Sequence, residues 1–424
     1  MRASTHSALW SLLALALMPL APARGADAES DALMLESAPV APTPAVGRDT
    51  RLYLEGAAGS ARLRHAGGAE NRTRLSLDFR HSARLGAGWR GVISDRLDRF
   101  QPAQAGPDEI VNSLREVYLS WQPEGATTVL EFGRVNLRYG PGYGYNPTDF
   151  FRDGSLRAPT TADPVALREH RLGTVMLRVQ RLWSKGSLSL ALSPKLADGP
   201  SADGWSLDLG STNQQDRALM VLGTQFSQRL SSQVLLYKAS AIAPALGVNV
   251  TALVSDAAVA HLEWTRSREP DLADRTLALT ARSAPRNRFV GGATYTTPGK
   301  LSVTAEYQYN GFGLDQGGWA ALGATPPAQL AYLREALRLQ ELAPRQAYLI
   351  YITQKGLGLK DLDLTAYLRF NPGDDSRLAW FELRHHWPRF DLSAQWQHHI
   401  GRSGSEFGVL PDRRVLQVLG TYHF

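Results

Sequence analysis

The stretch at residues 301–310, LSVTAEYQYN, alternates apolar and polar side chains from end to end. Successive side chains of a β-strand point to opposite faces, so this stretch predicts a strand with one apolar and one polar face. Such a strand suits a wall with lipid on one side and a watery lumen on the other. The apolar face would hold Leu301, Val303, Ala305, Tyr307 and Tyr309, and the polar face Ser302, Thr304, Glu306, Gln308 and Asn310.

The same period of two recurs at residues 74–80, 362–370 and 390–397. A soluble β-sandwich also alternates in this way, because one face of each sheet packs on the core. Alternation by itself therefore leaves a transmembrane barrel and a secreted or periplasmic β-protein as the two interpretations.

The carboxyl-terminal residues favour the barrel. Counting back from Phe424, the residues Tyr422, Gly420, Val418 and Leu416 share one face of a predicted strand. A terminal aromatic residue with apolar residues at every second position resembles the closing-strand signal read by the outer-membrane assembly machinery. We therefore predict that Tyr422 and Phe424 serve as an assembly signal.

Polar breaks of two lengths separate the alternating runs, and outer-membrane barrels have short turns on one side and long loops on the other. About 19 candidate strands can be drawn, and since bacterial single-chain barrels have even strand numbers, we expect 18, with 16 as the alternative. The surplus strand is expected between residues 230 and 285. The short breaks are Ser82 to Arg84, Ser184-Lys185, Ser231-Ser232, Thr297-Pro298-Gly299 and Trp387-Pro388, and the long ones are residues 96–113, 138–171, 195–215, 311–345 and 401–412.

The amino-terminal residues predict export. Arg2 is followed by an apolar run over residues 8–20 and then by small residues, the order of a secretory signal peptide. We place the signal peptide at 1–25, a flexible periplasmic lead-in at 26–49 and the barrel at 50–424. Removing Arg2 and Arg24 would lower the net charge from +6 to +4. So small a positive charge on a chain of this length does not indicate nucleic acid as a partner.

The remaining composition narrows the class of protein. After the signal peptide no apolar run approaches the roughly 20 residues of a transmembrane helix, so a helical inner-membrane protein is excluded. The chain has no cysteine, so neither a disulfide framework nor a thiolate metal site is available. Together these features predict an all-β transmembrane antiparallel barrel in the outer membrane of a Gram-negative cell.

One loop is predicted to be helical. In TPPAQLAYLREALRLQELAP, residues 325–344, Thr325 can cap a helix and prolines suit its first turn. Leu330, Leu333, Leu337 and Leu342 would lie roughly on one face. Two interpretations stay open: the helix folds into the pore as a constriction or plug, or it caps the extracellular rim.

The least generic segment is EFGRVNLRYGPGYGYNPTDFFR, residues 131–152. Apolar residues fall on even numbers before Gly133 and on odd numbers after it, which predicts a β-bulge there. Arg134, Asn136 and Arg138 would then point into the lumen together. The glycines at 140, 142 and 144 permit unusual backbone turns, and Asn-Pro-Thr-Asp at 146–149 predicts a turn.

Residues 115–155 resemble porin-like outer-membrane families, including the alginate-export type, in which a Gly-Arg strand and an aromatic-Gly pair lead into an Asn-Pro-x-Asp loop. This chain has Gly-Arg-Val and Tyr-Gly where those families often have Gly-Arg-Gln and Trp-Gly. The resemblance implies an inward loop whose Arg134, Arg138, Asp149 and Arg152 line or brace a constriction. In the alternative, Arg134 pairs with an acid such as Glu116 or Glu131 and only holds the barrel round.

The predicted lumen carries both signs of charge. Confined arginines would focus anions, but ion pairs could instead cross-brace the wall, and the sequence leaves both open. The predicted lumen residues include Arg74, Arg80, Arg115, Glu116, Glu306, Arg369 and Arg384.

Three functions follow in order. The first is a channel for small polar or anionic solutes, or for export of an acidic polymer; the second is a non-conducting barrel serving capsule or exopolysaccharide. An enzyme ranks third, because each pair His385-His386 and His398-His399 puts one ring on either face of its strand. We predict no catalytic residues, no metal and no cofactor, with outer-membrane lipids, the assembly machinery and a small solute as partners of a monomer.

Overall fold

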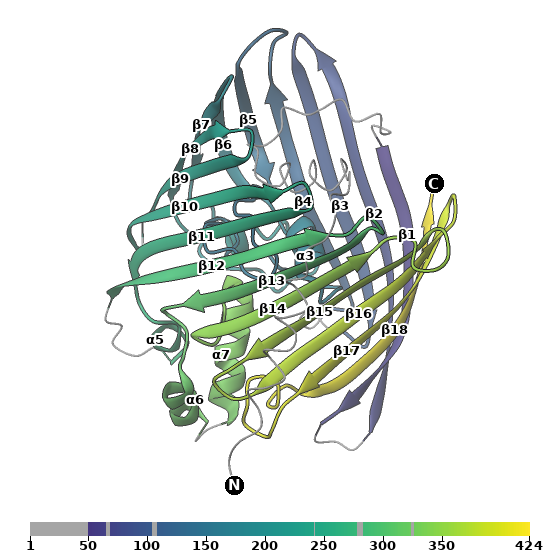
Figure 1. The fold of residues 1–424 in the computed structure, drawn as a ribbon. Helices are drawn as coiled ribbons and strands as arrows, with labels where there is room; N and C mark the ends of the chain where they lie inside the picture. The colour runs from purple at the N-terminus through teal and green to yellow at the C-terminus, as the bar shows by residue number, and fades with distance from the viewer. Residues whose placement is uncertain (1–49, 65–67, 104–107, 241, 278–282, 324–325) are drawn as a thin grey trace.

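The computed structural model describes residues 50–64, 68–103, 108–240, 242–277, 283–323 and 326–424; the predicted signal peptide and lead-in lie outside them. Within these ranges eighteen antiparallel strands form one sheet that closes on itself, because β1 pairs with both β2 and β18 (Figure 1). The strands are β1 (Thr50–Leu63), β2 (Ala69–Gly86), β3 (Trp89–Gln101), β4 (Ile110–Trp121), β5 (Thr128–Val135), β6 (Thr174–Trp183), β7 (Gly186–Ser193), β8 (Arg217–Ser227), β9 (Leu230–Ala239), β10 (Ile242–Ser255), β11 (Ala258–Glu269), β12 (Ala284–Thr296), β13 (Leu301–Asn310), β14 (Gln346–Gln354), β15 (Leu362–Asn371), β16 (Ser376–His386), β17 (Phe390–Ile400) and β18 (Asp412–His423).

Alternation along the strands sets the two surfaces of the wall. In β13, Thr304, Glu306 and Gln308 are buried inside, whereas Ala305 faces outward and is exposed. On β7 the outward Leu188, Leu190 and Leu192 are all exposed. A sandwich would bury such leucines between its sheets, so the apolar outer face identifies a barrel that spans a membrane. The predicted count of 18 strands is confirmed.

Connections differ between the two ends of the barrel. The turn end carries β-turns such as the one that joins β6 to β7, and the opposite end, the loop end, carries the long segments 136–173, 194–216, 311–345 and 401–411. Three predicted breaks are wrong: residues 82–84 lie within β2, residues 231–232 lie within β9, and β3 and β4 extend into the loop expected at 96–113. The polar residues of β3 suggested a loop, but Arg96 and Asp98 form an ion pair with each other inside the barrel.

Five short helices lie in the loops of the described residues: α3 (Pro164–Glu169), α4 (Leu209–Thr212), α5 (Leu272–Leu277), α6 (Gln316–Leu322) and α7 (Pro326–Leu339). No described helix is both long and apolar enough to cross a membrane. The predicted helix corresponds to α7, while its expected cap, Thr325, falls outside the described residues. Its buried face holds Tyr332, Ala336 and Leu339, and the predicted Leu333 is half-buried against them. Of the other predicted leucines, Leu342 is buried but follows the helix, and Leu337 is 54% exposed.

The interior of the barrel is divided into two halves. In the filled half, the inward faces of β6–β13, side chains such as Met176, Leu219 and Leu235 are fully covered and pack against Leu137 and Phe151 from the loop at 136–173. In the open half, the inward faces of β15–β18 and β1, Asp363, Arg369 and Arg384 keep between 23% and 36% of their side-chain surface exposed. Loops therefore occupy one side of the lumen and leave the other accessible.

Candidate functional site

The loop at residues 136–173, hereafter the inner loop, is docked on two wall carboxylates. Glu263 of β11 accepts hydrogen bonds from the Gly142 N–H (2.7 Å), Asn146 Nδ2 (2.9 Å) and the Thr148 hydroxyl (2.8 Å). Glu306 of β13 accepts from two further backbone N–H groups, those of residues 143 (2.6 Å) and 144 (3.1 Å). Buried carboxylates that accept several N–H bonds hold a backbone firmly, so these two glutamates fix the start of the inner loop to the wall.

The glycines of this segment are explained by that docking. Gly140 has φ +92°, a conformation that suits glycine, and a Cβ there would overlap the Glu263 carboxylate. A Cβ at Gly144 would meet the side-chain amide of Gln308. The Gly-Pro-Gly-Tyr-Gly motif thus allows the backbone to approach the wall closely.

Further along, the inner loop reaches the opposite wall. Arg74 of β2 donates to the Thr160 carbonyl (3.0 Å), and the Tyr367 hydroxyl of β15 donates to the Ala162 carbonyl (2.9 Å). Asp163 caps α3 by accepting from the Val165 N–H (3.1 Å). Burial raises the pKa of the Asp163 carboxyl to about 6. The inner loop therefore crosses the lumen.

A second inward segment, residues 311–345, is joined to the inner loop; we call it the helical loop. Arg152 forms an ion pair with Glu341, which also accepts from the Tyr145 hydroxyl and pairs with Arg288 of β12 (3.0 Å). The two arginines beside Glu341 hold the pKa of its carboxyl below the usual value, although burial alone would raise it. The end of the helical loop is thus bonded to the inner loop and to the inner face of β12, while Trp319 and Gln329 of the same loop donate to the Gly404 carbonyl at the loop end.

A cavity of about 540 Å³ lies between these loops and the wall. Its floor and one side come from the inner loop and α7, and its other side from the loop-end parts of β15–β18, β1 and β2. Leu333, Leu337, Tyr143 and Tyr367 give it apolar surface. Its charged lining residues are Arg72, Arg152, Arg168, Arg171, Arg369, Asp149, Glu341, Glu406 and Asp412.

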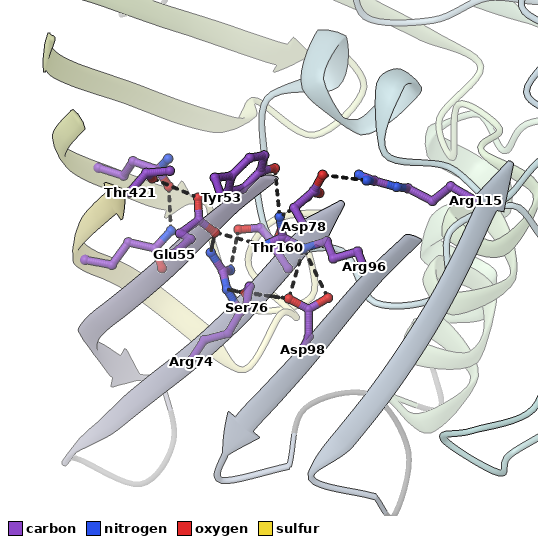
Figure 2. A network of polar contacts seen from close by, with 12 residues as sticks. Tyr53, Glu55, Arg74, Ser76, Asp78, Arg96, Asp98, Arg115, Thr160 and Thr421 are labelled. Atoms are coloured by element: carbon purple, nitrogen blue, oxygen red, sulfur yellow. Dashed lines mark hydrogen bonds and ion pairs between the residues drawn. The ribbon is translucent and has the colours of Figure 1, made fainter. Parts of the chain in front are cut away.

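Four adjacent strands, β1–β4, carry a network of ion pairs that we call the wall lattice (Figure 2). Arg96 at its centre bonds Glu55 (2.8 Å) and Asp98 (3.0 Å) and contacts Asp78 (3.4 Å). Arg115 donates to Asp78 (2.7 Å). The members are buried, so the lattice cross-links the strands and offers the lumen little free charge.

The predicted lumen arginines are all paired. Arg369 bonds Glu406 (3.0 Å) of the loop at 401–411, and Arg384 bonds Glu382 (2.8 Å); both arginines lie in the open half. The other predicted arginines pair as Arg74–Glu55, Arg80–Glu116 and Arg115–Asp78.

The predicted constriction residues have separate positions. Asp149 is buried and bonds Arg171 (2.8 Å), and Arg152 is buried against Glu341; both line the cavity and brace the loops. Arg138 is exposed, and none of residues 134, 136 and 138 lines this cavity. The bulge expected near Gly133 is wrong, because pairing runs without a register shift on both sides of β5.

Arg134 closes a gap in the wall. β5 ends at Val135, so the loop-end part of β4 has no pairing with β5. Residues 199–208, which we call the strap, lie beside this part of β4, where the Asn112 N–H donates to the Gly204 carbonyl (2.7 Å). Arg134 donates to the carbonyls of Gly173 (2.9 Å) and Leu207 (2.6 Å) and thereby ties the strap to the end of the inner loop. Pairing with Glu116 or Glu131 does not occur.

Three residues of the site were not predicted. Glu263 belongs to a strand in the region where the surplus strand was expected, although the alternation of His261, Glu263 and Thr265 with Leu262 and Trp264 was a signal for it. Glu341 and Arg288 join segments far apart in sequence, and no local pattern indicates such a pair.

The sequence matches no family profile and no curated protein. Solved structures are similar over almost the whole chain. OccAB1 of Acinetobacter baumannii superposes with a TM-score of 0.55 at 9% identity, covering 88% of this chain and 96% of its own. OpdL and OccK5 (OpdH) of Pseudomonas aeruginosa give TM-scores of 0.53 and 0.51 at 12% and 11% identity, each covering 89% of this chain and 98% of its own.

The likeness establishes the fold. It agrees with the resemblance to a porin-like outer-membrane barrel and gives no support to the alginate-export type in particular. Tyr422 and Phe424 point outward at the turn end and are exposed, as a strand-end aromatic pair should be. Their role as an assembly signal stays a prediction.

Proposed function

We propose that the protein is an outer-membrane channel for small polar solutes, with a preference for anions. The observation that carries the proposal is the 540 Å³ cavity inside a closed barrel, lined by arginines held in fixed positions. The apolar outer wall places the barrel in a membrane, and the open half keeps polar side chains accessible to water along the inside of that wall.

Charge in the cavity supports the anion preference. Five arginines and four carboxylates line it, so the cations exceed the acids by one. Arg168 donates to the carbonyls of Tyr139, Gly140 and Gly142, and its ion pair with Asp149 is long at 3.6 Å. Burial lowers the pKa of Arg168 to about 10, which leaves the guanidinium protonated at neutral pH. A confined cation excess raises the local concentration of anions.

The size of the solute follows from the inner loop. Because this loop contacts β2 through Thr160 and β15 through Ala162, it crosses the lumen below the cavity. A bent passage beside the loop suits small molecules better than a polymer chain. The channel interpretation is therefore favoured over polymer export.

The test is single-channel recording in a planar bilayer with a KCl gradient, using the refolded full chain. We expect discrete current steps and a reversal potential that indicates chloride preference. Replacing Arg72 of β2 or Arg369 of β15, which both line the cavity, with Gln should reduce that preference. Arg99→Gln is the matched control, because Arg99 is 63% exposed and lies outside the cavity.

Two outcomes would contradict the channel. A folded barrel that passes no current would favour the non-conducting structural barrel, which the crossing of the lumen by the inner loop would then explain. Unchanged selectivity in both cavity variants would remove the assigned role of these arginines.

A further inference from the structure

Four arginines gather on the outer surface at the loop end, and we call them the outer arginine cluster. They are Arg62 on β1, Arg377 on β16, and Arg413 and Arg414 on β18, and all four are exposed. This surface faces neither the cavity nor the inner loop. The proposed channel therefore leaves the cluster unexplained.

Strand pairing places these cations side by side. Arg62 lies directly opposite Arg414, and Arg414 lies opposite His398 of β17. Arg377 is opposite Ile400, two residues from His398 on the same strand. Neighbouring strands are about 4.8 Å apart, so one continuous basic patch extends over four adjacent strands, β16, β17, β18 and β1.

A β-bulge enriches the patch in cations. Arg62 of β1 pairs with Arg414 of β18, but the next residue, Leu63, pairs with Asp412, so Arg413 is an extra residue in β18. Arg413 and Arg414 are both exposed. Asp412, the acid next to them, turns inward, where its carboxylate oxygens accept from Arg72 at 2.6 and 2.9 Å. The bulge thus separates the acid from the arginines.

The cluster has no counter-charge of its own. Across the described residues, no carboxylate forms an ion pair with the guanidinium group of any of the four arginines. The acid nearest to Arg377 in sequence, Asp375, is an exposed turn residue and is not paired with it. Like charges directly opposite each other on a sheet destabilise it. Anions from outside the chain would relieve this repulsion.

The surface next to the patch is apolar. Leu416 and Val418 continue along β18 towards the turn end and are exposed, and Trp396 lies against His398 on β17. The Arg377 guanidinium sits 5.6 Å above the Phe370 ring. A molecule bound here would meet cations at the loop end and hydrocarbon just below, which is the layout of an anionic amphiphile in a membrane.

We propose that the outer arginine cluster binds the phosphate groups of a glycolipid in the outer leaflet. Arginine is suited to phosphate because its planar fork donates two parallel hydrogen bonds, and arginines on adjacent strands can engage more than one phosphate. The acyl chains would lie along Leu416 and Val418. The inference rests on the proposed placement in the outer membrane and not on conduction by the lumen.

The experiment is native mass spectrometry of the full chain in detergent, titrated with lipid A that carries two phosphates. The wild type should bind this lipid at least ten times more tightly than Arg62→Ser/Arg414→Ser. The matched control is Arg181→Ser/Lys360→Ser, which removes two exposed cations at the turn end. We expect it to bind within a factor of two of the wild type.

Two results would overturn the proposal. Equal losses in both double variants would indicate attraction to overall charge, and equal binding of lipid A stripped of its phosphates would indicate acyl contacts alone. Heat-modifiable mobility on a gel verifies that each variant is folded. Conductance of the Arg62→Ser/Arg414→Ser variant should stay at the wild-type value, so failure of lipid binding is separable from failure of the channel.

Discussion

The filled half and the open half of the barrel are built from the same antiparallel sheet, yet they treat the lumen in opposite ways. In the filled half, Leu219 and Leu235 provide an apolar inner surface, and Glu263 and Glu306 provide acceptors for the backbone of the inner loop. In the open half the inward Asp363, Arg369 and Arg384 keep between 23% and 36% of their side-chain surface exposed, although Tyr367 and Trp380 on the same strands are buried. The position of the passage is therefore decided by which wall residues can dock a loop.

The largest effect is expected from removing the dock itself. Glu263→Ala combined with Glu306→Ala leaves buried N–H donors of the inner loop without acceptors, and each unsatisfied donor costs about 1–3 kcal/mol. The loop should detach from the filled half, giving larger and noisier current steps and new protease cleavage between residues 140 and 148. Glu263→Gln, which keeps an acceptor oxygen, is the control. Unaltered currents and protease resistance in the double variant would refute the docking role.

The next effect compares the two halves by stability. Leu235 is 0% exposed between the wall and the inner loop, so Leu235→Ala should lower the free energy of unfolding by about 2–5 kcal/mol. Val415, half-buried in the open half, should lose no more than about 1 kcal/mol on replacement with Ala. Equilibrium unfolding in urea measures both. Equal losses would mean that the two halves are packed alike.

A smaller effect is expected from narrowing the cavity. Leu337 is exposed on α7 and lines it, so Leu337→Trp should lower the single-channel conductance by roughly a factor of two, since pore width limits conduction. Stability should barely change. Leu188→Trp, on the lipid-facing side of β7, is the size-matched control. A full current in Leu337→Trp would place the passage elsewhere.

The smallest effect concerns pH. Burial raises the pKa of Asp163 to about 6, so its carboxyl is neutral at pH 5 and ionised at pH 7.5. The preference for anions should therefore decrease as the pH is raised from 5 to 7.5. The free energy of unfolding should also decrease as the pH rises through 6, because folding raises the pKa of this carboxyl. Asp163→Asn keeps a capping side chain and should abolish the transition. The same titration in Asp163→Asn would assign it to another group.

The sequence predicted the wall well wherever only one face is apolar. The stretch Leu301–Asn310 matches β13 residue for residue, because lipid and lumen demand different side chains there. In β9, Leu235 is buried inside while Val234 and Leu236 face lipid. Both faces of β9 are then apolar, so the period of two disappears in this strand, which lies in the region where the surplus strand was expected.

The candidate site was predicted only in part. The resemblance of residues 115–155 to porin-like families implied an inward loop, and the glycines there allow that loop to lie close to the wall. The partners of Arg134 and Arg152 were not predictable, because Leu207 and Glu341 lie far along the chain and are brought close only by the closed wall. Pairing of buried charges depends on tertiary distance, which a local pattern does not contain.

The wall lattice also constrains how the sequence can diverge. Losing one partner of a buried ion pair costs about 3–5 kcal/mol, whereas exchanging the whole set for packed apolar side chains is often neutral. Glu55, Arg96 and Asp78 should therefore vary together in the lineage of this protein, while outward positions such as Leu77 drift freely among apolar residues. Coupled substitution inside and loose substitution outside would let a barrel of this kind keep its architecture while its sequence diverges.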